Sequence, residues 1–222
     1  MSGFYAILMR DVSLGFRAGG GALLGAMFFT LTILIFALAA GPDLALLGRI
    51  ATPILWTAAL LSTLVSLDRV YQADFEDGSL DLLVEAADPF EIAFLAKAFA
   101  HWLTAAAPLI VLSPVLGVML GLGPAGYWPL IGSLLIGTPA LSLIGSLAAA
   151  LTVSLRRASV LTTLLAAPLF TPIIIFGVGA AKAGAAADPA FAPSLMFLAA
   201  AGLFSLIVAP FAGAAAIRAN LG

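Results

Sequence analysis

Six long apolar runs dominate this sequence and restrict the folds that it can adopt. A helix that crosses a bilayer needs about 20 mainly apolar residues, and each run approaches or exceeds that length. The runs cover residues 20–40, 50–67, 98–122, 130–155, 160–181 and 195–217. Only 9% of all residues are charged, while 63% are hydrophobic. We therefore predict an all-α integral membrane protein in which residues 1–222 form a single six-span domain.

The basic residues predict how these spans are oriented. Six spans place both termini on one side of the membrane, and basic residues are enriched on the cytoplasmic side. The side of the termini would hold Arg10, Arg17, Arg69, Lys97, Arg156, Arg157 and Arg218. The other side would hold only Arg49 and Lys182. This bias predicts that both termini are cytoplasmic.

Residues 3–17 precede the first run and mix apolar with charged side chains. If this stretch is helical, its apolar residues can lie on lipid while Arg10, Asp11 and Arg17 face water. We predict an interfacial helix at the membrane surface. A poorly ordered tail is the alternative.

Residues 68–91 carry most of the acidic residues and separate the second run from the third. The predicted orientation makes this segment cytoplasmic. After Gly78, apolar residues recur at the spacing of one helix face, namely Leu80, Leu83, Val84 and Ala87. Asp81 and Glu85 fall on another face. We predict a short amphipathic helix that is suited to docking on a soluble partner.

Three acidic residues, Asp74, Glu76 and Asp77, lie just before this helix. They suggest a calcium-binding loop, but neither their spacing nor the position of Gly78 fits an EF-hand. We expect a solvated turn that faces the same partner.

The start and the middle of the third span have their own signals. Asp88, Pro89 and Glu91 match a helix start, with Asp88 as N-cap and Pro89 at the first helical position. Further along, Pro108 and Pro114 are expected to kink the span, which membrane helices tolerate.

Ionisable side chains are missing from the middle of every run. Ion-coupled transporters usually place such groups there, so any transport would draw its energy from a partner. The sequence contains no phosphate-binding loop that ends in Gly-Lys-Ser/Thr, so we expect it to bind no ATP by that route. We therefore expect that the chain is not an enzyme and that any ATPase activity resides in a partner subunit.

The single histidine, His101, lies four residues after Lys97 and so on the same helix face. A metal or catalytic role would need further ligands, and the chain has no second histidine and no cysteine. We interpret both residues as interfacial or packing residues, and we expect no metal and no directly bound cofactor.

Small residues recur every four positions along the fourth span, at Thr138, Ser142, Ser146, Ala150 and Ser154. This spacing is typical of close helix packing. A lining of hydroxyl groups along a substrate path is the alternative. The packing could lie within one chain or between two copies.

Several strings resemble the haem exporter protein B family of the cytochrome c maturation system. The similarity extends over nearly the whole chain and is densest from Trp56 to Pro108. The matching residues are Leu8-Met9-Arg10-Asp11, Gly15-Phe16-Arg17, Phe28-Phe29, Pro53-Ile54-Leu55-Trp56, Ala59-Leu60-Leu61, Leu67-Asp68-Arg69, Asp74, Glu76-Asp77-Gly78-Ser79-Leu80, Ala96-Lys97, His101-Trp102 and Pro108-Leu109. Departures occur at Phe36-Ala37 and at Glu85-Ala86-Ala87-Asp88.

The resemblance implies a permease subunit with the fold of type-2 ABC exporters, in the inner membrane of a bacterium. Its implied partners are a cytoplasmic ATPase that binds the ATP, a haem-handling membrane subunit, a small single-span subunit and, indirectly, a periplasmic haem chaperone. A complete permease of this type needs two six-span halves, so the second half would be either a second copy of the chain or another subunit. ATP hydrolysis would drive release of the haem-loaded chaperone, and haem would be handled by the complex.

The docking surface for the ATPase would comprise Asp74, Glu76, Asp77, Gly78, Leu80, Asp81, Leu83, Val84 and Glu85. Two other functions stay open from the sequence. One is an ABC permease for another hydrophobic substrate, such as a lipid or a drug. The other is a scaffold that organises the maturation complex without moving.

Overall fold

The computed structural model describes residues 2–17, 21–86 and 89–221, and every regular element in these ranges is a helix. In chain order these are α1 (Ser2–Phe16), α2 (Gly21–Ala40), α3 (Leu44–Ser66), the 3-10 helix η1 (Leu67–Arg69), α4 (Gln72–Glu76), α5 (Ser79–Ala86), α6 (Phe90–His101), the π-helix η2 (Trp102–Ala106), α7 (Ala107–Met119), the 3-10 helix η3 (Pro124–Gly126), α8 (Tyr127–Thr152), α9 (Ala158–Ala185) and α10 (Phe191–Leu221). Six stretches of the described chain are long and apolar enough to cross a membrane. The predicted all-α class and number of spans are thus confirmed.

Several helices extend beyond the apolar runs from which they were predicted. The second span begins at Leu44 and not at residue 50, because Asp43 caps α3. Its Oδ1 accepts hydrogen bonds from two backbone N–H groups of the first turn, each at 3.0 Å. Arg49 interrupts the hydropathy of this region but stays in the helix, where its Nε donates to the carbonyl of Ala45 at 3.2 Å. Caps therefore set helix ends that hydropathy misses.

The bundle packs around Trp56 of α3, whose side chain is fully buried. The indole Nε1 donates to Ser133 Oγ at 3.1 Å, so the polar edge of the ring is satisfied within the apolar core. The ring lies against two glycines, Gly137 of α8 and Gly177 of α9. A Cβ at these positions would come within 2.5 Å and 2.3 Å of the indole. Glycine is required at both positions for three helices to meet at the ring.

The small residues of the fourth span pack inside the chain. Thr138, Ser142, Ser146 and Ala150 are buried, and only Ser154 at the end of the row is exposed. This burial fits the packing interpretation, and it places the contacts within one chain.

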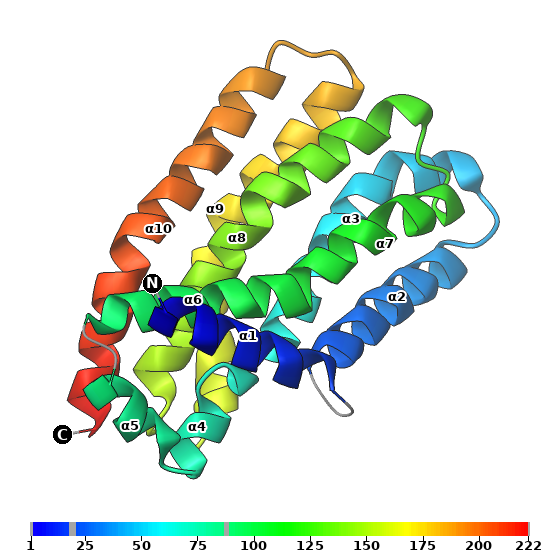
Figure 1. Cartoon of the computed structure of the whole chain (residues 1–222). Helices are drawn as coiled ribbons and strands as arrows, with labels where there is room; N and C mark the ends of the chain where they lie inside the picture. The colour runs from blue at the N-terminus through cyan, green and yellow to red at the C-terminus, as the bar shows by residue number, and fades with distance from the viewer. Residues whose placement is uncertain (1, 18–20, 87–88, 222) are drawn as a thin grey trace.

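The third span changes direction part-way along its length. Figure 1 shows α6 lying beside α1 across one end of the bundle, while α7 rises along the other helices. The π-helix η2 joins the two, and Pro108 follows directly as one of the first residues of α7. Proline and π-turns are both established causes of sharp bends. The bend therefore lies where a kink was predicted at Pro108, but a π-helix, which the sequence did not predict, also contributes to it.

The start of α6 differs from the predicted cap. Pro89 is the N-cap residue, with an extended backbone, and the helix begins at Phe90. The first helical position was expected at Pro89 itself. Asp88 lies outside the described residues.

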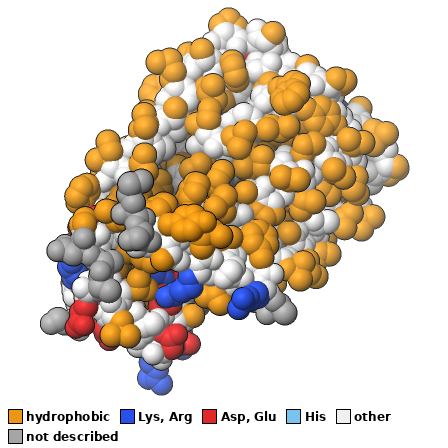
Figure 2. All heavy atoms as spheres, in the orientation of Figure 1, with side chains coloured by type: hydrophobic (Ala, Val, Ile, Leu, Met, Phe, Trp, Pro, Cys, Tyr) orange, Lys and Arg blue, Asp and Glu red, His pale blue; other side chains and the backbone are white. Residues whose placement is uncertain are grey.

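The two ends of the bundle have different surfaces. α1, α4, α5, the α8–α9 turn and the C-terminus gather at one end, and the α2–α3, α7–α8 and α9–α10 connections lie at the other (Figure 1). On the face drawn in Figure 2, the visible basic and acidic side chains cluster at the first end, and hydrophobic side chains cover the remainder. We call the end that holds α1, α4, α5 and the C-terminus the charged end.

Candidate functional site

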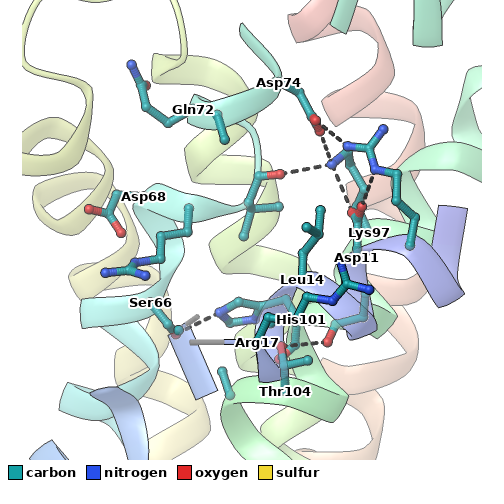
Figure 3. A pocket seen from close by; sticks show the side chains of 18 of the residues that line it. Asp11, Leu14, Arg17, Ser66, Asp68, Gln72, Asp74, Lys97, His101 and Thr104 are labelled. Carbon is teal, nitrogen blue, oxygen red and sulfur yellow. Dashed lines mark hydrogen bonds and ion pairs between the residues drawn. The ribbon is translucent and has the colours of Figure 1, made fainter. Parts of the chain in front are cut away.

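Four ionisable side chains meet at the charged end in one cluster, which joins α1, α4 and α6. Lys97 of α6 contacts both Asp11 of α1, at 2.9 Å from Nζ to Oδ2, and Asp74 of α4. Arg10 also pairs with Asp74, and its Nε lies 3.1 Å from Asp11 Oδ1. Two cations thus alternate with two carboxylates (Figure 3). We call these four residues the ion cluster.

Burial makes the ion cluster more than a surface feature. The Lys97 side chain is 2% exposed and that of Asp74 is 9% exposed. The Lys97 ammonium also donates to the carbonyl of Val70 at 3.1 Å, and it lies 5.4 Å from the centre of the Tyr71 ring. A buried ion pair is tolerated only where its remaining hydrogen bonds are satisfied, and this ammonium has three acceptors. Losing one partner would leave an uncompensated charge.

Arg10 forms the outer part of the ion cluster and is partly exposed. Burial alone would lower the pKa of its guanidinium, but the carboxylates of Asp74 and Asp11 outweigh that effect and raise the pKa above its usual value. Arg10 therefore stays charged and holds α1 against α4.

A cavity of about 550 Å³ opens beside the ion cluster. Its walls come from α1, the end of α3, α4 and α6, and Figure 3 shows the side chains that line it. Arg17, Asp68 and His101 are among them. The cavity thus combines charged and apolar lining at the charged end of a membrane protein.

His101 lies in the wall of this cavity and is held by two serine hydroxyls. Its Nε2 is 2.8 Å from Ser66 Oγ of α3, and its Nδ1 is 3.1 Å from Ser142 Oγ of α8. Both ring nitrogens are therefore engaged in helix packing. Across the described ranges, no group of three or more His, Cys, Asp or Glu side chains is arranged to hold a metal ion. The imidazole serves to connect α3, α6 and α8.

The outward surface of α4 and α5 is acidic. Glu76, Asp77, Asp81 and Glu85 are all exposed, and Leu82 beside them is 67% exposed. The backbone N–H of Ser79 donates to Asp77 Oδ1 at 2.9 Å, and hydrogen bonding from Ser79 holds the pKa of the Asp77 carboxyl below its usual value. The Ser79 hydroxyl donates instead to Asp74 Oδ1, at 3.1 Å. We call the five exposed residues Glu76, Asp77, Asp81, Leu82 and Glu85 the acidic face.

Two residues expected to meet a partner instead face the chain's own interior. Asp74 was predicted to lie in a solvated turn, but it is buried in the ion cluster. Leu80 was predicted to be covered by a partner, yet its side chain is fully buried against the chain's own core. Leu83 and Val84 are half-buried against that same core. The apolar face of α5 therefore holds the helix to its own bundle.

The structure thus divides the predicted site residues into separate groups. Arg10, Asp11, Asp74 and Lys97 come together in the ion cluster. Glu76, Asp77, Asp81 and Glu85 belong with Leu82 to the acidic face. Gly78 is exposed between Asp77 and Asp81 and has the left-handed conformation, at φ +75°. Arg17 lines the cavity, and Ser146 is buried in α8 with no hydrogen-bond partner in the described chain.

The inward position of Asp74 had a signal in the sequence. Asp74 follows Val70 and Tyr71 by four and three residues, so all three share a helical face if the segment is helical. Val70 and Tyr71 are both buried. An acidic residue on an apolar face predicts a buried ion pair, whereas the acidic cluster in the sequence suggested a solvated turn.

The fold and the site define a multi-pass membrane protein of six helical spans, with a charged end built from α1, α4, α5 and the start of α6. Residues 2–220 match the model of the CcmB protein family. The chain belongs to this family.

Curated relatives cover the chain almost from end to end. A protein of Paracoccus denitrificans is 52% identical over 218 residues, which are 97% of this chain and 99% of its own. One of Bradyrhizobium diazoefficiens is 45% identical over 221 residues and covers both chains fully. One of Escherichia coli K12 is 37% identical over 218 residues, 98% of this chain and 99% of its own. All three are named heme exporter protein B.

Proposed function

We propose that this chain is the membrane permease subunit of an ABC-type complex for cytochrome c maturation. A cytoplasmic ATPase subunit supplies the energy, and the movement that it produces serves haem delivery by releasing the haem-loaded periplasmic chaperone from the complex. Support comes from the family, whose curated members are named heme exporter protein B. The further partners are a haem-handling membrane subunit, a small single-span subunit and a second copy of this chain.

The observation that carries this proposal is the position of the acidic face. It projects from α4 and α5 at the charged end, while Leu80 and Asp74 fix the opposite side of the same segment to the bundle. A partner bound to the acidic face would therefore contact a segment that is firmly packed against the bundle. Its movement would pass through Asp74 to Lys97 of α6, and from there through the π-helix to α7.

The docking partner should carry basic residues. The acidic face carries four exposed carboxylates, and Leu82, which lies between Asp81 and Glu85 in the sequence, exposes an apolar side chain that a partner can contact. Charge complementarity steers such contacts, and a central apolar residue adds binding free energy. Asp74 and Leu80 are removed from the predicted docking surface, because neither is accessible.

The orientation follows from the same arrangement. The acidic face, both termini and most basic residues share the charged end, so we assign this end to the cytoplasm of the bacterial inner membrane. The opposite end then faces the periplasm, where the haem-handling subunit and the chaperone are engaged.

Co-purification tests the docking step. The chain is affinity-tagged in its native membrane, extracted in mild detergent, and its partners are identified by mass spectrometry. We expect a P-loop ATPase in stoichiometric amount with the unmodified chain, and its loss from the double variant Asp81→Lys/Glu85→Lys. The control is Asp188→Lys in the α9–α10 connection, which reverses a charge at the opposite end of the bundle and leaves the cap of α3 intact, so it should retain the ATPase.

Equal recovery of the ATPase with the Asp81→Lys/Glu85→Lys variant and with the Asp188→Lys control would contradict the docking surface. A second measurement separates the permease from a passive scaffold. Cytochrome c assembly should fail when the ATPase subunit is assembled but catalytically inactive. Normal assembly under that condition would favour the scaffold.

A further inference from the structure

Asp68 and Arg69 lie at the boundary between two cavities of different character. The cavity beside the ion cluster, of about 550 Å³, has a charged rim. A second cavity, of about 400 Å³, runs over α3 between α2 and α9 and is lined mainly by apolar residues. Asp68 and Arg69 line both. The two cavities therefore adjoin, with these two charges at their junction.

The second cavity has the composition of an acyl-chain groove. Its apolar lining is Leu24, Phe28, Leu61, Leu64 and Val65. These residues belong to membrane spans, so the groove runs from the charged end toward the hydrocarbon interior. Ser159 and Thr163 of α9 close its side. A hydrocarbon chain would bury this surface, which no side chain of the described residues fills.

The junction offers groups for both charges of a zwitterion. Asp68 Oδ1 is buried and accepts no hydrogen bond from the described chain, while Oδ2 has only Ser159 Oγ at 3.5 Å. A buried carboxylate oxygen without a donor is costly. Arg17 on the rim and Arg69 at the junction supply cations. The Arg69 side chain passes beside Gly21 of α2, where a Cβ would lie 3.5 Å from the arginine Cδ.

We propose that this site binds an aminophospholipid, of which phosphatidylethanolamine is the simplest. The primary ammonium donates to Asp68, the phosphate lies between Arg17 and Arg69, and one acyl chain occupies the groove over α3. Charge complementarity selects this occupant: a headgroup without an N–H donor leaves Asp68 unsatisfied, and a soluble headgroup leaves the groove empty. The lipid would fill the space between α1, α2 and α3 beside the ion cluster.

Native mass spectrometry of the chain in mild detergent tests the assignment. The delipidated chain is titrated with phosphatidylethanolamine, phosphatidylcholine and phosphatidylglycerol of identical acyl chains. Phosphatidylcholine keeps the phosphate but has no N–H donor. We expect the ethanolamine lipid to bind roughly tenfold more tightly than the choline lipid, which corresponds to one charge-assisted hydrogen bond.

Two variants locate the site. Asp68→Asn removes the charge at nearly constant shape and should reduce the preference for ethanolamine over choline by roughly tenfold. Val65→Trp should narrow the groove and weaken both lipids together. The control Asp188→Asn makes the same chemical change at the opposite end of the bundle, and it should leave the preference unchanged.

Three results would overturn the proposal. Equal binding of the ethanolamine and choline lipids by the unmodified chain would remove the role of the ammonium. Tightest binding of phosphatidylglycerol would make the junction an anion site. Cross-linking of the Leu24→Cys variant to a second copy in native membranes, with no lipid retained, would show that protein fills the groove.

Discussion

Lys97 of α6 and Asp74 of α4 form a buried ion pair, although 23 positions separate them in the sequence. The pair connects the segment that carries the acidic face to the helix that leads into the third span. Asp11 completes the environment of the same ammonium, so α1 is held at the same point. Three elements at the charged end are thereby tied to one side chain.

Replacing Lys97 by methionine should destabilise the chain by about 3–5 kcal/mol, because two carboxylates would lose their buried cation. Thermal unfolding in detergent measures the loss. Adding Asp74→Asn should recover part of it, since the remaining Asp11 and Arg10 then balance each other. Glu85→Gln, an exposed change, should stay within about 0.5 kcal/mol of the unmodified chain. Additive losses in the double variant would show that the two residues do not interact.

Gly177→Ala should destabilise the bundle by about 1–3 kcal/mol, because the new methyl group would overlap the fully buried indole of Trp56. Gly132→Ala is the matched control. It lies in α8, where a Cβ would meet nothing within 4 Å, and there alanine should be neutral or slightly stabilising. Unfolding temperatures in one detergent compare the two. Equal effects would contradict the packing described around Trp56.

The chain contains no cysteine, so single cysteines can report its orientation without background. Glu85→Cys at the charged end should react with a membrane-impermeant maleimide only after the membrane of spheroplasts is permeabilised. Asp188→Cys, in the α9–α10 connection, should react in intact spheroplasts. The reverse pattern would place the acidic face outside the cytoplasm and would exclude docking to a cytoplasmic ATPase.

Hydropathy predicted the six spans because each is a long apolar run, and composition alone carries that information. It did not predict that α6 lies beside α1. The change of direction between α6 and α7 occurs at a π-helix and at Pro108, and it depends on how these residues pack in the folded chain. The apolar face that Asp74 shares with Val70 and Tyr71 is a sign of its burial, but the other three members of the ion cluster come from distant parts of the sequence, which hydropathy does not connect. The apolar spacing correctly predicted a helix at α5 with one apolar face. The chain's own core covers Leu80 on that face, where a partner had been expected.

If the ion cluster connects α5 to α6, movement of α5 should reach α7. Spin labels at exposed positions can measure it in the reconstituted complex, as distances to Leu206→Cys on α10. One pair uses Glu85→Cys on α5, and the other uses Val115→Cys on α7. We expect a change from ADP to a non-hydrolysable ATP analogue to alter both distances, and Lys97→Met to abolish the change at α7 while keeping that at α5. A nucleotide-dependent shift at α5 with no shift at α7 in the unmodified chain would show that the ion cluster does not transmit the movement.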